Sequence, residues 1–364
     1  MIDAAAKKRI EEAVAPKPKW SIEPASSEWA TEQLPPREHL LVDERTGRGA
    51  MDKFGAWVFA GPGGAGKSFA TIGLALAVAS GRRWLGTFKT SAPGRSLIVA
   101  AEDYTEDIRR RAHAIAAADL IPAAAMERLH ILSIHDRVTS LVGKIGDAYA
   151  PGDDTVSLCA ELAKLKPYDL VVVDPYGRIA GVSVDADNAA AAATIGALNM
   201  IATAARGLVL GVTHTSLRAR IAAKNGAPEG ATGIRGATGQ SDYARGVIRL
   251  EKDDSATWLS LAKANHVAQW EPIGLRRGDH GELVPLDATA LAVIAVSKSS
   301  DTKTAKRESA VAERNELDDA AAQRAIAENP CATVRDLIAV VCKARSCGTD
   351  RAHSAVTRAR LAAP

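Results

Sequence analysis

The chain has 364 residues, of which 47% are hydrophobic and 24% charged. This is the composition of a globular protein with one large domain and a small appendage, or with two modest domains. The net charge is only +3, so bulk charge does not indicate a nucleic-acid partner and any basic surface has to be local. The start of the chain lacks an apolar signal core and no apolar run approaches membrane-spanning length, so we expect a cytoplasmic protein with no membrane contact.

The cysteines show no CxxC spacing and are expected to be free thiols in a reducing cytosol. They are Cys159, Cys331, Cys342 and Cys347. The alternative is that Cys342 and Cys347 are two ligands of a metal site, but no second Cys/His pair stands at a suitable spacing. The spacing therefore favours free thiols.

Residues 1–50 are predicted to form an N-terminal arm. A short charged helix over 4–14 is followed by a segment that contains five prolines, which break regular structure. Trp20, Trp29 and the run Leu40-Leu41-Val42 indicate that parts of the arm pack onto something. The sequence leaves open whether this is a neighbouring subunit or the surface of the chain's own core.

The stretch Gly61–Ser68 fits the P-loop pattern G-x-x-x-x-G-K-[ST] at every required position. Glycines let successive backbone N–H groups turn towards phosphate oxygens, Lys67 reaches the β- and γ-phosphates of ATP, and the Ser68 hydroxyl holds Mg²⁺. An apolar strand over 56–60 precedes the loop and an Ala/Leu-rich helix over 69–80 follows it, as the motif requires. The alternative is a glycine-rich turn between core elements. The residues expected to bind the nucleotide are Gly61, Pro62, Gly63, Gly64, Ala65, Gly66, Lys67, Ser68 and Phe69.

Apolar strands alternate with helical patterns over residues 51–286. Strands are predicted over 96–101, 169–174 and 207–213, and helices over 104–119, 155–166 and 188–206, with Asp103 and Asp187 as N-caps of the first and last of these helices. The strands are continuously apolar, which implies burial on both faces. This predicts an α/β fold with a parallel central sheet between layers of helices. Two later strands, 246–251 and 257–262, are predicted to pair as an antiparallel hairpin at the edge of the sheet.

The C-terminal part is predicted to be a linker followed by a small helical module. Residues 287–318 are polar with little apolar periodicity, whereas 319–364 show three short helices that suit a helix-turn-helix or winged-helix module. Six Lys/Arg stand against two acids from Cys331 onward. The third helix carries Arg351, His353, Arg358 and Arg360, which favours a recognition helix on DNA phosphates. The alternative is a charged bundle that binds a protein.

Two acids at the ends of apolar strands are the candidates for metal binding and catalysis. Asp174 follows a run of three valines and is predicted to hold Mg²⁺; the alternative is a turn residue before Pro175. Glu102 follows another apolar strand, at the carboxyl edge where ligands bind in open α/β folds. We predict that Glu102 orients and deprotonates the attacking water, against an ordinary strand-end acid. Asp103 either shares this role or only caps the helix.

His214 ends the strand over 207–213 at the same edge and is predicted to sense the γ-phosphate; the alternative is a histidine satisfied by local hydrogen bonds. The following segment to Tyr243 is rich in Gly and Ala and carries basic residues predicted to grip a nucleic-acid backbone, against a plain surface loop. These residues are Arg218, Arg220, Lys224 and Arg235. Beyond it, Arg245 or Lys263 is a candidate arginine-finger-type cation for an adjacent subunit's ATP; surface salt bridges are the alternative.

This ordered series resembles the hexameric replicative helicases of the plasmid RepA type, which are RecA-fold ATPases of the AAA-type P-loop class. It consists of the P-loop, Ala101-Glu102-Asp103, Val173-Asp174, His214, Arg235-Gly236, Asp242, Arg245 and Lys263-Ala264-Asn265, and it covers roughly residues 35–285. The resemblance implies that Lys67, Ser68 and Asp174 bind phosphate and Mg²⁺, that Glu102 is the catalytic base and His214 the sensor. It also implies that Arg245 is the finger given to the neighbouring subunit. The loop after His214 would face a channel that holds single-stranded DNA.

Three features depart from the family's pattern: the N-terminal arm, the C-terminal module and the lack of a second histidine beside His214. The leading hypothesis is an ATP-dependent DNA helicase or translocase, a hexameric ring with ATP between subunits. It would serve replication of a plasmid, phage or mobile element, with the C-terminal module on origin DNA or replication proteins. The second hypothesis is a recombinase-like or regulatory AAA ATPase that binds DNA without unwinding it. The third is a P-loop kinase or metabolic ATPase, against which the basic loop and the basic module argue.

Overall fold

The computed structural model describes residues 26, 31–185, 187–214, 239–253 and 255–361, with the side chains of 296–312 excepted. Contacts divide the chain into two compact units, Met1–Leu286 and Asp287–Pro364. The expected helix over 4–14, both arm tryptophans and the four basic residues predicted to bind nucleic acid lie outside the described residues; these four are Arg218, Arg220, Lys224 and Arg235.

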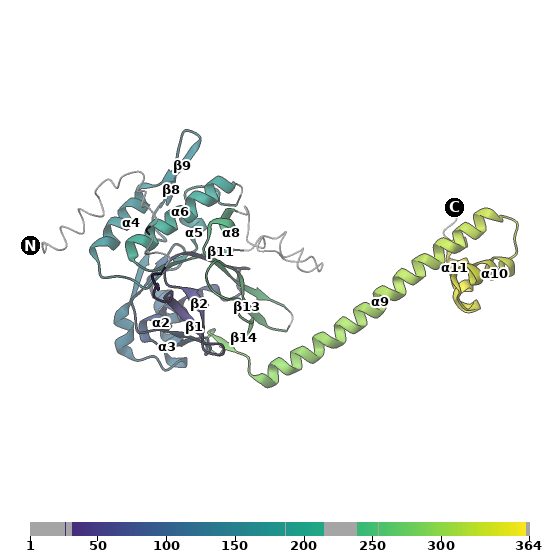
Figure 1. Cartoon of the computed structure of the whole chain (residues 1–364), viewed down its shortest axis with the longest axis horizontal. Coiled ribbons are helices and arrows are strands. Elements are labelled where there is room, and N and C mark those ends of the chain that lie inside the picture. The colour runs from purple at the N-terminus through teal and green to yellow at the C-terminus, as the bar shows by residue number, and fades with distance from the viewer. Residues whose placement is uncertain (1–25, 27–30, 186, 215–238, 254, 362–364) are drawn as a thin grey trace, which may run out of the picture. The chain divides into compact units, whose positions relative to one another are not determined.

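The described residues of the first unit form a nine-stranded sheet in the order β15-β14-β13-β12-β3-β11-β10-β6-β7 (Figure 1). Six neighbouring strands are parallel: β12 (Gly246–Lys252), β3 (Gly55–Gly61), β11 (Leu208–His214), β10 (Leu170–Asp174), β6 (Ser96–Ala100) and β7 (Leu129–Ser133). Three antiparallel strands continue the sheet: β13 (Thr257–Ala264), β14 (Ile273–Arg277) and β15 (Leu283–Pro285). The predicted α/β fold of a RecA-like P-loop NTPase core is therefore confirmed, and the predicted hairpin is followed by two further strands.

Helices cover both faces of this sheet. Side chains alternate along β3, so that Trp57 and Phe59 pack on one face and Ala56 and Val58 on the other. The first face is covered by α2 (Lys67–Ser80) and α3 (Thr105–Ala118), and the second by α4 (Asp153–Lys164) and α6 (Asn188–Ala205). Burial on both faces explains why these strands read as continuous apolar runs.

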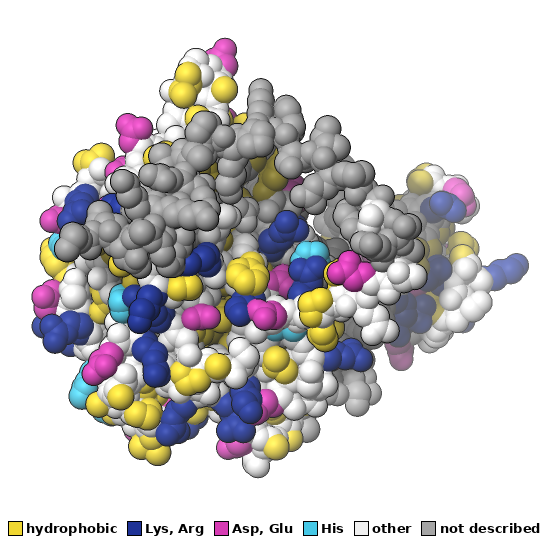
Figure 2. Space-filling model, turned by 60° about the vertical axis from the view of Figure 1, so that its left-hand side comes forward, with side chains coloured by type: hydrophobic (Ala, Val, Ile, Leu, Met, Phe, Trp, Pro, Cys, Tyr) yellow, Lys and Arg dark blue, Asp and Glu magenta, His cyan; other side chains and the backbone are white. Residues whose placement is uncertain are grey.

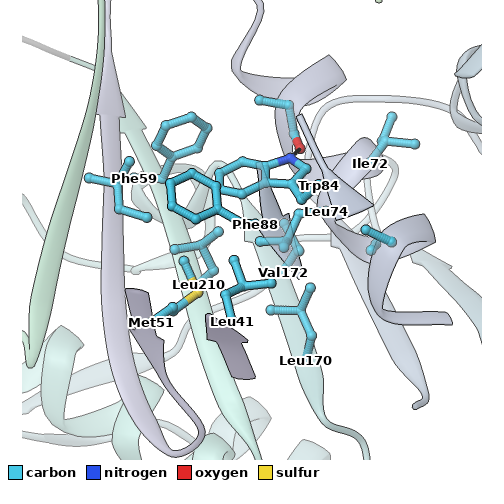
Figure 3. Packing of buried hydrophobic residues seen from close by; sticks show 14 of the residues in the cluster. Leu41, Met51, Phe59, Ile72, Leu74, Trp84, Phe88, Leu170, Val172 and Leu210 are labelled. Carbon is cyan, nitrogen blue, oxygen red and sulfur yellow. Dashed lines mark hydrogen bonds between the residues drawn. The ribbon is translucent and has the colours of Figure 1, made fainter. Parts of the chain in front are cut away.

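A second, four-stranded sheet extends the core on the α2 side. Its order is β2-β1-β5-β4, with β1 at His39–Asp43, β2 at Arg48–Asp52, β4 at Arg83–Trp84 and β5 at Phe88–Thr90. Leu41 and Met51 pack with Trp84 and Phe88 against the central strands (Figure 3). Fully burying a side chain such as Leu41 contributes about 1.5–3 kcal/mol. Residues 39–50 of the predicted arm are thus part of the chain's own core.

The helix α6 corrects the expectation that no apolar run reaches membrane-spanning length. Its 18 residues, Asn188–Ala205, have a mean hydropathy of 1.2, which is enough by length and composition to cross a membrane. Half of the helix is buried inside the protein, where it packs on β3 and β11. Asp187 caps it as predicted, because its carboxylate accepts a hydrogen bond from the Ala189 N–H at 2.7 Å. We therefore interpret α6 as a core helix.

Asp103 does not cap its helix. The N-cap of α3 is Tyr104, which makes no side-chain capping bond, and the Asp103 carboxylate instead pairs with Arg111 further along the helix. A guanidinium with two N–H groups in reach is a stronger partner for a carboxylate than a single backbone N–H. Other connections include the ribbon of β8 (Val142–Ile145) and β9 (Ala148–Pro151) and the short helices η2 (Ala123–Arg128), α5 (Tyr176–Ile179) and α8 (Gly239–Tyr243).

The segment predicted as a linker, 287–318, is helical. It belongs to α9, which runs from Ala288 to Glu328 behind Asp287, whose side chain accepts a hydrogen bond from the Ala290 N–H at 2.8 Å. The stretch contains no Gly or Pro and is rich in Ala, Lys and Glu, all strong helix formers. Its polarity concealed the helix because the prediction relied on an apolar stripe.

The end of α9 packs with α10 (Val334–Arg345) and α11 (Thr349–Leu361), so the three predicted helices are present. Thr333 and Asp336 form a capping box at the start of α10. Ser346, with φ 46°, ends α10 and leaves a turn of three residues before α11. Leu337, Val341 and Val356 are the larger side chains of this small core.

Candidate functional site

The P-loop connects β3 to α2, as the sequence predicts. Gly66 has φ 105° and Gly64 has φ 73°, left-handed conformations that favour glycine. A Cβ on Gly61 would come within 2.5 Å of the Leu250 carbonyl oxygen, so the end of β3 requires glycine as well. Cβ atoms on Gly63 and Gly64 would meet nothing within 4 Å. The loop therefore has the backbone conformation and the open surface that a phosphate group needs.

Lys67 brings a buried ammonium group to the loop. Its Nζ donates hydrogen bonds to the carbonyl oxygens of Gly61 at 2.8 Å and Pro62 at 2.9 Å, and it lies 3.3 Å from Nδ1 of His214. Burial lowers the pKa of Lys67, while the charges of Asp174 and Glu102 raise it. The predicted phosphate ligand, the sensor histidine and two acids are thus gathered at one edge of the sheet.

Asp174 and Ser68 form the candidate metal site. Asp174 lies at the end of β10 and accepts a hydrogen bond from the Ser68 hydroxyl. Burial raises the pKa of Asp174 to about 6, against the opposing effects of Ser68 and Lys67. In the part of the chain that the structure describes, no group of three or more His, Cys, Asp and Glu is placed to hold a metal. Two protein oxygens fit Mg²⁺, which usually takes its remaining ligands from phosphates and water.

Glu102 and Asp103 have different surroundings although they are adjacent. Asp103 is paired with Arg111, and its backbone carbonyl accepts a hydrogen bond from the Ser133 hydroxyl at 2.9 Å. Glu102 is exposed and has no hydrogen-bond or ion-pair partner among the described residues, yet it lies close enough to influence the pKa values of Lys67 and Asp174. Of the two acids, Glu102 is therefore the one whose carboxylate is available to a water molecule.

His214 lies at the carboxyl end of β11, directly beside the end of β3, since its register partner is Gly61. The next described residue after the segment 215–238 is Gly239, whose N–H donates to the Asn188 side chain at 3.0 Å. Gln240 is anchored by its amide to the Val184 carbonyl at 3.0 Å and by the Tyr176 hydroxyl. The basic segment therefore begins beside Lys67 and ends at a fixed point on the α5–α6 side of the unit.

Arg245 lies at the opposite edge of the sheet from the P-loop. It directly precedes β12, which is parallel to β3, and its N–H donates to the Ala56 carbonyl at 2.9 Å, at the start of β3. Gly55, with φ 94°, leaves room for the Arg245 side chain, because a Cβ there would lie 3.1 Å from Cγ of Arg245. The side chain lines a cleft of about 1070 Å³ together with Lys53, Asn199, Arg206 and His266.

Lys263 is at the same edge but is occupied. Its Nζ donates to the carbonyl oxygens of Ser241, Asp242 and Ala244 at 2.7, 2.8 and 3.0 Å. An ammonium group has three N–H donors, so all of them are used to fix the chain before β12. Of the two candidate cations, only Arg245 is placed in an open cleft.

The arginines of α11 are largely paired within the second unit, contrary to their predicted exposure to DNA. Arg351 and Arg345 both bind the fully buried carboxylate of Asp318, with closest distances of 2.6 and 3.1 Å. Arg358 pairs with Asp319 at 2.6 Å, and Arg360 donates to the Ala332 carbonyl at 3.3 Å. The acids responsible lie in α9, at the boundary of the segment predicted to be a linker. On the face in Figure 2, basic and acidic side chains of described residues are likewise interspersed.

Sequence reasoning missed Arg277 of β14. Its Nη2 donates to the Gly64 carbonyl of the P-loop at 2.7 Å. The two residues are 213 positions apart, and Arg277 stands in no recognisable motif, so no local signal identifies it.

Comparisons with known proteins point to an ATPase family. Residues 17–219, more than half of the chain, match the family described as AAA domain. Among solved structures, an ATPase domain of another protein is similar with 11% identity and a TM-score of 0.46, over 64% of this chain and 85% of that one. The KaiC-like protein PH0186 from Pyrococcus horikoshii OT3 is similar with 13% identity and a TM-score of 0.43, over 69% of this chain and 99% of that one. No curated protein matches the chain.

Proposed function

The chain belongs to the AAA domain family and carries the P-loop of an ATPase, and from this premise we propose that it is an ATP-driven DNA translocase or helicase. In this proposal it acts in the cytoplasm as a ring of identical subunits, of the hexameric RepA type, that serves replication of a plasmid, phage or mobile element. ATP is its substrate and Mg²⁺ its cofactor.

The observation that carries the proposal is the division of the site between two edges of one sheet. Lys67, Ser68, Glu102, Asp174 and His214 gather at the carboxyl edge. Arg245 lies at the amino edge of the same sheet, at the start of β12. In one copy, Arg245 is therefore remote from its own P-loop, and a second copy that docks its Arg245 cleft onto the carboxyl edge supplies an arginine finger.

Each residue then has one task in hydrolysis. The P-loop amides and Lys67 bind the phosphates, Ser68 and Asp174 hold Mg²⁺, and Glu102 orients the attacking water and accepts its proton. The metal ion, when bound, neutralises phosphate charge. Arg245 from the neighbouring copy stabilises the negative charge that develops on the transferred group.

The nucleic-acid part of the proposal rests on the segment 215–238. It starts one residue after His214, which lies 3.3 Å from Lys67, and its sequence contains Arg218, Arg220, Lys224 and Arg235. A basic segment attached to a phosphate sensor suits a strand-gripping loop whose position depends on the nucleotide. The alternative is a regulatory or recombinase-like ATPase, and the internal pairing of the α11 arginines favours a second unit that binds protein rather than DNA.

Strand displacement on a forked DNA duplex tests the proposal. We expect displacement by the wild type with ATP and Mg²⁺ and none by Lys67→Ala, together with a particle mass of several copies and ATP hydrolysis that single-stranded DNA stimulates. ATPase activity that DNA stimulates without any strand displacement would favour the regulatory alternative. A monomer whose hydrolysis is unchanged by DNA would refute both.

A further inference from the structure

The β14–β15 hairpin lies directly against the P-loop. Arg277, the last residue of β14, donates from Nη2 to the Gly64 carbonyl at 2.7 Å and from Nη1 to the Gly281 carbonyl at 3.3 Å. Leu283 of β15 approaches the same loop, because a Cβ on Gly66 would lie 3.3 Å from its Cδ2 and 3.4 Å from Nη2 of Arg277. The hairpin thus touches the two glycines whose left-handed conformations shape the loop.

The turn of the hairpin is closely fitted to the first turn of α2. Gly281, with φ 88°, leaves no room for a side chain, since a Cβ there would lie 2.9 Å from Cζ of Phe69. Two backbone bonds close the turn, from the Gly278 N–H to the Glu282 carbonyl at 2.8 Å and from the Gly281 N–H to the Gly278 carbonyl at 3.1 Å. The position of Arg277 is therefore set by the hairpin and by its contact with α2.

The carbonyl that Arg277 binds has a direct relation to phosphate binding. A phosphate cradle needs successive N–H groups turned inward, which leaves the intervening carbonyl groups turned outward. Glycine has the greatest backbone freedom of all residues, and neither Gly63 nor Gly64 has an atom near the position of a Cβ. A charged donor on the Gly64 carbonyl is thus a restraint on an otherwise free part of the loop, and such a bond is stronger than a neutral one.

We propose that Arg277 is a positioning residue that holds the P-loop in its phosphate-accepting conformation. Phosphate binding and the order of the β14–β15 hairpin are then coupled, because each stabilises the same loop conformation and such coupling is reciprocal. This inference rests on the proposed binding of ATP at the P-loop, and it adds a residue from a distant hairpin to that site.

Arg276 offers a matched control. It precedes Arg277 on β14, so its side chain points to the opposite side of the strand. It is also exposed, and it makes no hydrogen bond or ion pair within the described ranges of the chain. Arg276→Ala removes the same charge from the same strand without touching the loop.

The test is the affinity for ADP with Mg²⁺, measured by calorimetry for the wild type, Arg277→Ala, Arg277→Lys and Arg276→Ala. We expect Arg277→Ala to bind ADP about tenfold more weakly, as for the loss of one charge-assisted hydrogen bond. For ATP hydrolysis, KM should rise by a similar factor with kcat unchanged. Lysine keeps a cation that can reach one carbonyl, so Arg277→Lys should be intermediate, and Arg276→Ala should match the wild type.

Hydrogen exchange gives the reciprocal measurement. ADP should slow backbone exchange in residues 273–285 of the wild type and of Arg276→Ala, but not of Arg277→Ala. Wild-type ADP affinity in Arg277→Ala, or an equal loss in Arg276→Ala, would overturn the inference. A loss of affinity in Arg277→Ala that accompanies general unfolding, with no loss in a folded Arg277→Lys, would also count against it. If the wild-type chain itself binds no ADP, the proposed function fails instead.

Discussion

The two units use their charged side chains in opposite ways. At the P-loop edge of the first unit, Glu102 has no partner among the described residues, and at the other edge Arg245 lines an open cleft. In the second unit, Arg345, Arg351 and Arg358 are bound to acids of the same unit. A charge whose hydrogen bonds are already used contributes to stability, whereas one without a partner is available to a substrate or to another molecule. Charge content alone therefore does not identify a binding surface.

The largest expected effect is at Arg245. Arg245→Ala should lower kcat by about 10⁴-fold, because an arginine finger contributes most of the charge stabilisation from the neighbouring subunit. Steady-state ATP hydrolysis in the presence of single-stranded DNA measures this loss.

Mixing Arg245→Ala with Lys67→Ala provides the control for a role in the neighbouring copy. At a mixed interface, an intact P-loop from the first variant meets an intact Arg245 from the second. Activity should return in part as the two are mixed, and the absence of rescue at every ratio would exclude an action between copies.

The next largest effect is at Glu102. Glu102→Gln should lower kcat by about 10³-fold with ADP affinity retained, because glutamine keeps the shape of the side chain but does not accept a proton. Single-turnover hydrolysis measures the chemical step. The neighbouring Asp103→Asn is the control: it breaks the pair with Arg111 and should affect stability more than kcat. Normal hydrolysis by Glu102→Gln would show that the base is another group.

Asp318 should have the largest effect in the second unit. Its carboxylate is fully buried and binds arginines of α10 and α11, so Asp318→Asn should destabilise this unit by about 2 kcal/mol. Hydrogen exchange over 334–361, followed by mass spectrometry, should then be about 30-fold faster at neutral pH.

The same carboxylate gives the second unit a pH dependence. Burial raises the pKa of Asp318, but hydrogen bonds from Arg351 and Arg345 outweigh this effect, so that the pKa lies below its ordinary value in the folded state. The stabilisation is therefore present above pH about 4 and is lost as the pH falls through the folded pKa. Asp318→Asn should not show this loss, and an equal acid sensitivity in both proteins would contradict the assignment.

The smallest effect is expected at Arg358. Its pair with Asp319 is partly exposed on both sides, so Arg358→Ala should cost less than about 1 kcal/mol of stability in the same exchange experiment. Because Asp319 already neutralises this charge, affinity for duplex DNA, measured by fluorescence anisotropy, should also remain within about threefold of the wild-type value. A larger loss of DNA affinity would mean that α11 contacts DNA phosphates after all.

The sequence allowed the central features to be predicted where the signal is local. The P-loop, the strand-end positions of Glu102, Asp174 and His214 and the parallel sheet follow from residues within a few positions of one another. The partners of α11 were not predictable in this way, because Asp318 lies 33 positions from Arg351 in a stretch whose polarity suggested a linker. The small sheet was missed since β4 and β5 are only two and three residues long.

The order of strands in the sheet has a consequence for synthesis of the protein on the ribosome. β3, which leads into the P-loop, pairs with β11 and β12, and both are encoded roughly 150 residues or more after it. At about 5–20 residues per second, this strand leaves the ribosome roughly 10–30 seconds before either neighbour exists. During that interval Trp57, Val58 and Phe59 are without the strands that later bury them, so the nascent chain is expected to need chaperones most at this stage.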